Sequence, residues 1–223
     1  MIAPADDCPM NARQRFIART LDLVIATPLL ILSLPVQLVL AIVVRATSPG
    51  PAIYRAQRIG RGQKPFTMYK FRSMQNAPSG SDVKVVGKSD PRITPVGQFL
   101  RKSKLDELPQ LLNVVLGSMS MVGPRPQSAE YVSHYPPFAM VTLSVPPGIA
   151  GPATMVNQEK LLTGSTPEEN ERMYLEELLP KRLQIDVDFV NNWTVGVYLK
   201  VLWRTLTAMF ARSHARTSAP LAN

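Results

Sequence analysis

Between Leu21 and Val44 the chain reads LDLVIATPLLILSLPVQLVLAIVV, and this apolar stretch decides what kind of fold the sequence can form. After Asp22 it holds no charged residue until Arg45, so a helix over it is long enough to cross a bilayer. It is longer than the apolar core of a usual secretory signal, and no small-residue cleavage pattern follows it. We therefore expect a membrane segment that is retained in the protein.

Two prolines inside this stretch argue against a straight span. Pro28 and Pro35 each remove a helix hydrogen bond and kink the axis. A break at Pro35 leaves arms of about 14 and 9 apolar residues, roughly 21 and 14 Å long, each shorter than the ~30 Å hydrocarbon core. Both ends carry basic flanks, which tend to stay cytoplasmic: Arg13, Arg15, Arg19, Arg45, Arg55 and Arg58. The sequence predicts a re-entrant helix hairpin; the alternative is a tilted single span with a proline kink.

The composition suits a folded domain with an anionic partner. The 223 residues are enough for one domain and a membrane element. Lys and Arg number 25 against 16 Asp and Glu, and the formal charge of +9 suits nucleic acid, anionic lipid or phosphorylated small molecules. The single cysteine, Cys8, excludes an intrachain disulfide and favours a reducing compartment. No P-loop, GxGxxG or GxSxG pattern occurs.

The middle of the chain predicts a β-hairpin followed by two short helices. The runs AIYRAQRIG and FTMYKFRSM flank the turn-rich GRGQKP, and on the second strand Lys70 and Arg72 would share one face. The polar stretch 75–88 is expected to be a loop. Helices are expected over Val96 to Lys102 and over residues 108–116, the second ended by Gly117.

Two further helices are expected near the C-terminal end. Thr166 and Glu169 form a capping-box pattern that opens a helix ending near Pro180. Residues 195–212 form an amphipathic pattern with basic character, which fits either core packing or contact with a membrane surface. Trp193 and Trp203 would suit such an interface.

Two adjacent acids, Asp106 and Glu107, stand between a basic run and an apolar helix-like run in KLDELPQLLNVV. Pro109 is welcome only in the first turn of a helix, so the acids lie at or just before a helix N-terminus. There the exposed N–H groups favour the ionised carboxylate and should lower its pKa. An ionised Asp is a competent nucleophile or a ligand for a hard cation such as Mg²⁺.

Basic residues surround these acids in the sequence. Guanidinium groups bind phosphate oxygens in a bidentate manner, so this set could hold a diphosphate while the carboxylates act on it with a metal. The simpler interpretation is that the acids cap a helix and pair with surface cations. The basic residues are Arg92, Arg101, Lys102, Lys104 and, in GPRP, Arg125.

Four motifs occur in the order and spacing of a known family. They are YKFRSM (69–74), DPRITPVGQFLRKSKLDELPQLLNVV (90–115), GSMSMVGPRP (117–126) and PGIAGPAT (147–154). In them the chain resembles the bacterial sugar transferases, the monotopic polyprenol-phosphate phosphoglycosyl transferases. The likeness extends from about Arg15 to Thr207.

The resemblance implies a two-step transfer. Asp106 would attack the β-phosphate of a nucleoside diphosphate sugar, here a UDP-sugar, releasing UMP and keeping a phosphosugar on its carboxylate. Polyprenol phosphate, such as undecaprenyl phosphate, would then take the phosphosugar. Glu107 beside it would help Asp106 to hold Mg²⁺, the implied cofactor, and would assist proton handling.

The resemblance also assigns binding residues and the helix break. Arg101 and Arg125 match family phosphate ligands, and Lys70 with Arg72 match the basic pair of the KFR motif. Arg92 is included among the substrate-binding residues. The family's first helix breaks at a serine and proline, matching Ser33 and Pro35, although Leu34 stands directly before the proline.

The expected fold is α+β and mainly helical. Residues 1–12 and 213–223 are expected to be disordered tails, 13–48 a re-entrant membrane helix-hairpin, and 49–212 a small cytosolic catalytic domain with a short β-hairpin and interfacial amphipathic helices. The family places this domain at the cytoplasmic face of the bacterial inner membrane, at the first membrane step of polysaccharide biosynthesis. The expected partners are the nucleoside diphosphate sugar, polyprenol phosphate and membrane lipid, with a homodimer allowed and nucleic acid not expected.

Some features leave alternatives open. The chain could keep the fold as an inactive membrane scaffold of glycan assembly, which the intact Asp106 and Glu107 argue against. A basic nucleic-acid binder is disfavoured by the apolar hairpin and the lack of a reading motif. The sequence departs from the common family pattern at Pro146, at Tyr198 and after Gly151, so sugar preference could differ.

Overall fold

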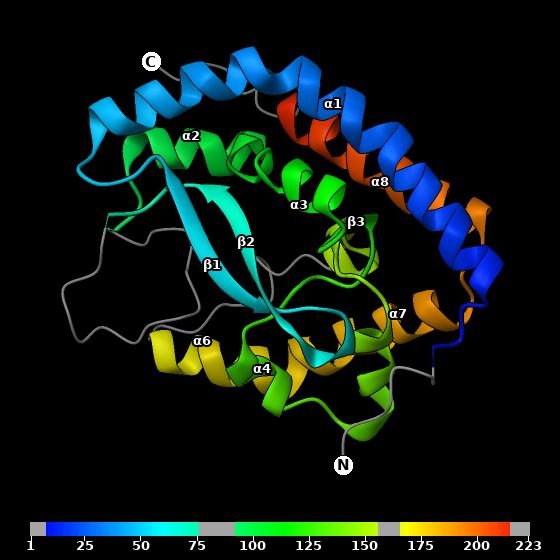
Figure 1. The fold of residues 1–223 in the computed structure, drawn as a ribbon. Helices are drawn as coiled ribbons and strands as arrows, with labels where there is room; N and C mark the ends of the chain where they lie inside the picture. The colour runs from blue at the N-terminus through cyan, green and yellow to red at the C-terminus, as the bar shows by residue number, and fades with distance from the viewer. Residues whose placement is uncertain (1–7, 76–91, 156–165, 215–223) are drawn as a thin grey trace.

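A computed structural model describes residues 8–75, 92–155 and 166–214. In this part the protein is mostly helical, with two small two-stranded sheets and one long apolar helix near the N-terminus (Figure 1). This agrees with the expected mainly helical α+β fold. The main elements are α1 (Ala12–Thr47), β1 (Ile53–Ile59), β2 (Pro65–Phe71), α2 (Pro95–Ser103), α3 (Gln110–Leu116), β3 (Ser120–Val122), α4 (Ala129–Ser133), β4 (Gly148–Ala150), α6 (Pro167–Met173), α7 (Leu179–Asn191) and α8 (Val195–His214).

The first helix, α1, is continuous and bowed rather than broken. It runs through both prolines over 36 residues and arches across α2, α3 and α8 (Figure 1). The predicted break at Pro35 is therefore not observed. Ser33 Oγ donates to the Leu30 carbonyl at 3.0 Å, and Gln37 Nε2 donates to Ser33 Oγ at 2.9 Å, so polar groups bridge the turn that the proline interrupts. A long helix can bend around a proline in this way without ending.

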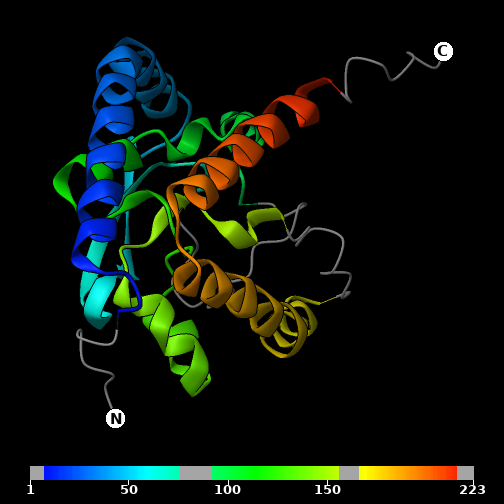
Figure 2. The same ribbon diagram turned by 90° about the vertical axis from the view of Figure 1, so that its right-hand side faces the viewer.

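The N-terminal part of α1, around Asp22 and called its first foot below, is fixed by a buried carboxylate. Asp22 Oδ1 accepts hydrogen bonds from Ser120 Oγ, the Met121 N–H and the Tyr198 hydroxyl, each at 2.8 Å. The guanidinium of Arg19 also donates to carbonyls in the last turn of α3. The start of α8 is thus joined to α1, and Figure 2 shows α8 running away from α1 beyond this point.

The second foot is fixed by a buried arginine. Arg72 NH2 donates to the Ser48 carbonyl at 2.6 Å, to Ser48 Oγ at 2.9 Å and to the Val44 carbonyl at 3.3 Å. These groups lie at the C-terminal end of α1, where backbone carbonyls lack helix partners and a cation is favoured. Val44 also packs with Phe71 and Leu100.

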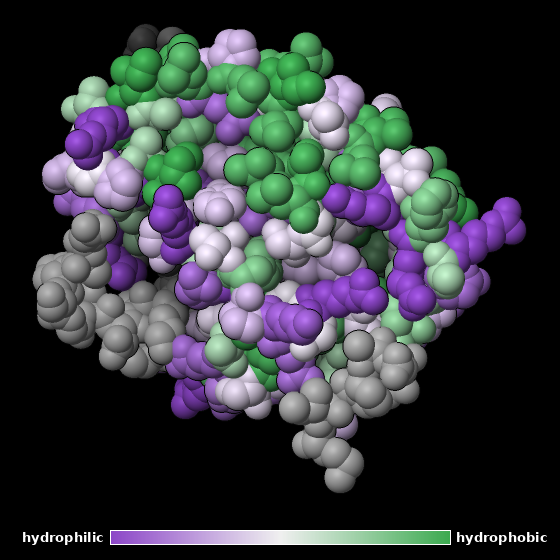
Figure 3. Space-filling view, in the orientation of Figure 1, coloured by the Kyte–Doolittle hydropathy of each residue, from purple (hydrophilic) through white to green (hydrophobic). Residues whose placement is uncertain are grey.

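Between its feet α1 is exposed and apolar. Leu32 and Leu38 are 75% and 65% exposed. Hydrophobic side chains gather along the edge of the molecule that α1 forms in the orientation of Figure 1, and hydrophilic ones are more frequent elsewhere on this face (Figure 3). Both ends of α1 pack against the rest of the protein. The exposed apolar middle of the helix, around Leu32 and called its crown below, therefore projects from one face of the molecule.

Removing the Tyr198 hydroxyl tests the first foot. We expect Tyr198→Phe to lower the free energy of unfolding by about 1–2 kcal/mol, because buried Asp22 loses one of three donors. Unfolding of the detergent-solubilised protein would measure it. Tyr54→Phe is the matched control, since Tyr54 is 57% exposed; equal losses in both variants would contradict the assignment.

The β-hairpin forms as predicted and is held against α3. Strands β1 and β2 pair antiparallel, with Tyr54 opposite Lys70. The Asn113 side chain accepts from the Tyr69 N–H at 3.0 Å and donates to the Thr67 carbonyl at 2.8 Å. Helix α3 then ends at Gly117, whose φ of 87° is left-handed, as the sequence indicated.

A second sheet, of two parallel strands, places the GPRP segment. Strand β3 pairs with β4, and Gly123, directly after β3, touches Gly148, the first residue of β4. A Cβ added at Gly148 would lie 2.0 Å from the Gly123 nitrogen, so only glycine allows this approach. The chain leaves the contact through Pro124 into Arg125.

The C-terminal helices correct two expectations. The capping box of Thr166 and Glu169 is present, but the helical path does not end near Pro180. A π-turn over Tyr174–Leu178 leads directly into α7, and Pro180 occupies the first turn, where a missing N–H costs little. Trp193 is buried against Tyr198 rather than lying at an interface, whereas Trp203 is 68% exposed.

The tails fall largely outside the described residues. Residues 1–7 and 215–223 are not described, and neither is most of the expected loop, 76–91. Within the first expected tail, Met10 is buried in the main core and Asn11 caps α1 through a capping box. At the other end α8 continues to His214.

A buried acid on α7 makes stability depend on pH. Burial raises the pKa of Asp186 to about 7, although Arg182 and the Ala153 N–H act in the opposite direction. Since the folded protein then holds a proton that the unfolded chain releases near pH 4, this group's contribution is fully present below about pH 4 and is lost as pH rises to about 7. We compare the free energy of unfolding of the wild type with that of Asp186→Asn. We expect the wild-type value, relative to the variant, to fall by at most about 1.4 kcal/mol per pH unit in this window. Chemical unfolding from pH 5 to 8 would measure it; exposed Asp188→Asn is the control, and a pH-independent difference would contradict it.

Candidate active site

The two adjacent acids lie on a short turn between α2 and α3. Helix α2 ends at Ser103, and Lys104 takes a left-handed conformation with φ of 61°. The chain then forms a 3₁₀ turn over Leu105–Glu107, which leads into α3. The predicted position before a helix N-terminus is confirmed, and Asp106 is only 7% exposed.

Glu107 is held by two cations from distant segments. Its Oε1 accepts from Arg125 NH2 at 3.0 Å and lies 3.5 Å from Lys70 Nζ. Arg125 comes from the GPRP segment and Lys70 from β2. Burial alone would raise the pKa of Glu107, but the charges of Arg125 and Lys70 hold it well below the usual range. Glu107 is therefore ionised.

Asp106 has the opposite electrostatic character. Burial and the neighbouring charge of Glu107 raise its pKa, and the opposing charges of Lys70, Lys104 and Arg101 do not cancel this effect. The expectation that the helix N-terminus lowers this pKa is thus wrong for Asp106. Desolvation and a like charge outweigh the helix end here.

Three buried polar atoms at this turn lack a hydrogen-bond partner among the described residues. They are Asp106 Oδ1, Gln110 Nε2 and Arg101 NH1. Arg101 lies in the last turn of α2, and its charge acts on Asp106. A buried donor or acceptor without a partner is costly, so the turn is suited to a polar ligand.

The other predicted binding residues are more scattered. Arg72 donates to groups at the C-terminal end of α1, whereas Lys70 contacts Glu107. The two cations predicted as a basic pair therefore have different partners. Arg92 lies beside the bridge that pairs Met74 with Ile93, on the segment leading to α2.

Arg58 is a further cation near the site that was not predicted there. Its charge acts on both Lys70 and Arg125, and burial lowers its pKa. The signal was the strand pattern: Tyr54 lies opposite Lys70, and Arg58 is four residues along the same strand, so all three share one face. The cations around the two carboxylates leave an excess of positive charge that suits a di-anionic ligand.

Comparison with known proteins shows to which family the chain belongs. Residues 13–212 match the family model described as bacterial sugar transferase. The chain belongs to that family. The match covers α1, the turn with both acids and the GPRP segment.

Several named relatives are similar to this bacterial sugar transferase over most of its length. A protein of Escherichia coli K12, named UDP-glucose:undecaprenyl-phosphate glucose-1-phosphate transferase, is 35% identical over 96% of this chain and 44% of its own length. A protein of Caulobacter vibrioides with the same name is 36% identical over 88% of this chain and 71% of its own length. The undecaprenyl-phosphate galactose phosphotransferase of Salmonella typhimurium is 35% identical over 90% of this chain and 42% of its own length. The chain thus spans less than half the length of two of these relatives.

The magnesium expected at the two carboxylates would need further ligands from a substrate or water. In the part of the chain that the structure describes, no group of three or more His, Cys, Asp or Glu is arranged to hold a metal ion. Mg²⁺ often takes one or two carboxylates and completes its shell with substrate phosphates and water. Asp106 Oδ1 is buried and has no hydrogen-bond partner among the described residues, whereas Glu107 Oε1 already accepts from Arg125 and contacts Lys70.

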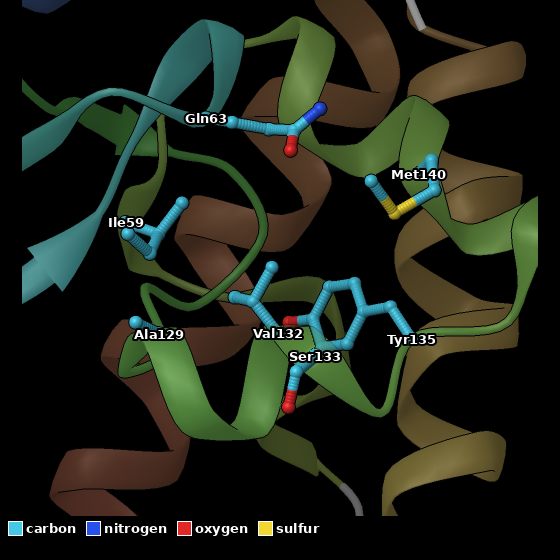
Figure 4. Close-up of a pocket in the computed structure, with 7 residues that line it drawn as sticks. All are labelled: Ile59, Gln63, Ala129, Val132, Ser133, Tyr135 and Met140. Carbon is cyan, nitrogen blue, oxygen red and sulfur yellow. The ribbon is translucent and has the colours of Figure 1, made fainter. Parts of the chain in front are cut away.

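A hollow of about 420 Å³ lies elsewhere on this bacterial sugar transferase, beside α4. In Figure 4, Val132 and the Tyr135 ring lie between Ile59 on one side and Met140 on the other. Its lining carries no Lys, Arg, Asp or Glu. It therefore lacks the charge that a diphosphate site requires, and the turn with the two acids remains the candidate active site.

Proposed function

We propose that this protein transfers a sugar 1-phosphate from a UDP-sugar to undecaprenyl phosphate and releases UMP. The observation that carries the proposal is the buried acid pair inside a cage of cations, with one Asp106 oxygen left without a partner. The names of the relatives support the same donor and acceptor classes.

In the first step the Asp106 carboxylate attacks the β-phosphorus of the donor. A carboxylate O–P bond forms, the P–O bond to the UMP phosphate breaks, and UMP leaves with that electron pair. In the second step an oxygen of undecaprenyl phosphate attacks the same phosphorus. The acyl phosphate O–P bond breaks, the diphosphate-linked sugar leaves, and the Asp106 carboxylate is regenerated.

The surrounding cations bind and orient the diphosphate. Arg125 and Lys70 are positioned by Glu107, and Arg101 adds charge from the end of α2. Because Glu107 is held ionised by these cations, its part is to position them, and proton handling by Glu107 remains a prediction. Mg²⁺, when bound at Asp106 with the donor, would neutralise charge that develops on the phosphates.

The arch of α1 supports membrane entry from one side. Helix α1 is long and apolar enough to cross a bilayer, yet both of its ends contact the same body. We infer that its crown, around Leu32, enters the inner membrane and that both feet stay on the cytoplasmic face, as the basic flanks favour. In a Cys8→Ser background, single cysteines at Arg13 and Arg61 should react with an impermeant maleimide from the same side; labelling from opposite sides would overturn this.

The function is tested by release of UMP from a panel of UDP-sugars, with undecaprenyl phosphate and Mg²⁺ present. We expect release with at least one donor that depends on the lipid acceptor for more than one turnover. Without acceptor, a single burst of at most one UMP per protein is expected. Folded protein that releases no UMP with any donor would overturn the proposal and favour the scaffold alternative.

A further inference from the structure

Gln110 is a buried polar residue of the site to which the two-step transfer assigns no role. It opens α3, is 3% exposed, and its Nε2 has no hydrogen-bond partner among the described residues. An amide N–H that is buried without a partner costs free energy, so such a group usually has a ligand.

The position of Gln110 relative to Asp106 indicates which ligand this is. The backbone continues from the 3₁₀ turn at Leu105 through Leu108 and Pro109 into α3, and its hydrogen bonds here join residues three apart, as from the Leu108 N–H to the Leu105 carbonyl. Gln110 therefore follows Asp106 by little more than one turn of this path. Asp106 Oδ1 is also buried without a partner in the described structure.

The two unpaired groups require ligands of opposite character. Gln110 Nε2 needs an acceptor oxygen, whereas Asp106 Oδ1 needs a cation, a donor or an electrophile. They are not bonded to each other. A phosphoryl group that reaches Asp106 satisfies both, because its phosphorus meets the carboxylate while a non-bridging oxygen can accept from the amide.

We propose that Gln110 is a further catalytic residue, whose side-chain amide donates to a non-bridging oxygen of the phosphoryl group that moves to and from Asp106. This inference rests on the proposed function. A neutral donor at this point stabilises charge on the phosphoryl oxygens without adding another cation to the cage. It forms no covalent bond and moves no proton.

The test compares two nucleotides on protein that cannot turn over. UDP carries the β-phosphate and UMP does not. Calorimetry would measure the affinity of each nucleotide for two proteins: the Asp106→Asn variant, and the double variant Asp106→Asn, Gln110→Met. We expect Gln110→Met to weaken UDP binding by about 5- to 10-fold and to leave UMP binding unchanged. Met keeps the length of the side chain and removes the donor. Gln98→Met on the exposed face of α2 is the matched control, with no expected effect on either nucleotide.

Two results with UDP and UMP would overturn the contact. Equal UDP affinity in both proteins would overturn the phosphoryl contact, as would an equal weakening of UDP and UMP, which would indicate a purely structural role. If neither nucleotide binds Asp106→Asn while that protein remains folded, the proposed function itself fails, and the inference fails with it. In the otherwise unchanged enzyme, Gln110→Met should lower kcat by about 10- to 100-fold, consistent with loss of one donor.

Discussion

The Asp106→Asn protein releases UMP at least about 10³- to 10⁴-fold more slowly than the unchanged protein, if Asp106 is the nucleophile. The amide has nearly the same size as the carboxylate, but it cannot form the acyl phosphate. Asp106 is buried on a turn that carries no other carboxylate free of cations, so no neighbouring group replaces it. Initial rates with undecaprenyl phosphate would measure the loss.

Two comparisons make this result specific to the nucleophile. Asp188→Asn, at an exposed position of α7, should keep the full rate. The unchanged protein, incubated with donor but no lipid acceptor, should give a burst of UMP and a phosphosugar adduct detectable by mass, and Asp106→Asn should give neither. Equal rates in Asp106→Asn and the unchanged protein would remove Asp106 as the nucleophile.

Arg125→Met should lower kcat/KM by about 10²- to 10³-fold, because it removes a cation that faces the donor phosphates. Arg125 also donates to Glu107 at 3.0 Å, and its charge is the largest favourable influence that keeps the pKa of Glu107 low. The Arg125 charge also interacts with Asp106, the proposed nucleophile, whose pKa is already raised by burial. Because loss of Arg125 raises that pKa further, the acidic limb of the pH–rate profile should move to higher pH in the variant.

The coupling between Arg125 and Glu107 can be measured separately. If the two act as one unit, Glu107→Gln combined with Arg125→Met should cost little more than Arg125→Met alone. Arg61→Met, on the exposed turn of the hairpin, is the matched control for loss of a cation. Strictly additive effects, or an unchanged pH profile, would contradict the shared role.

The local features of the fold were predictable because each depends on neighbouring residues. The hairpin, the capping box at Thr166 and the helix end at Gly117 follow from turn and cap chemistry within a few residues. The position of the acids before α3 followed from Pro109 in the same way.

The features that were missed depend on contacts distant in the sequence. Arg72 turns away from the site because the C-terminal end of α1, some 24 residues earlier, offers it carbonyl groups. The pKa of Asp106 is raised by burial that no local pattern reveals. The continuity of α1 could not be predicted either, since a proline at position 35 is compatible with a break or with a bend.

The carboxylate at the first foot of α1 also constrains the order in which the protein can be made. Asp22 is bonded to groups 98, 99 and 176 residues later in the chain. At about 5–20 residues per second, ribosomes need about 9–35 s after Asp22 before Tyr198 is synthesised. Until Tyr198 is made, the hydrogen bonds that fix the start of α1 are incomplete. Early contact of the nascent helix with the bilayer would shield it from aggregation, so the membrane would act as its first folding partner and the catalytic body would assemble beneath it afterwards.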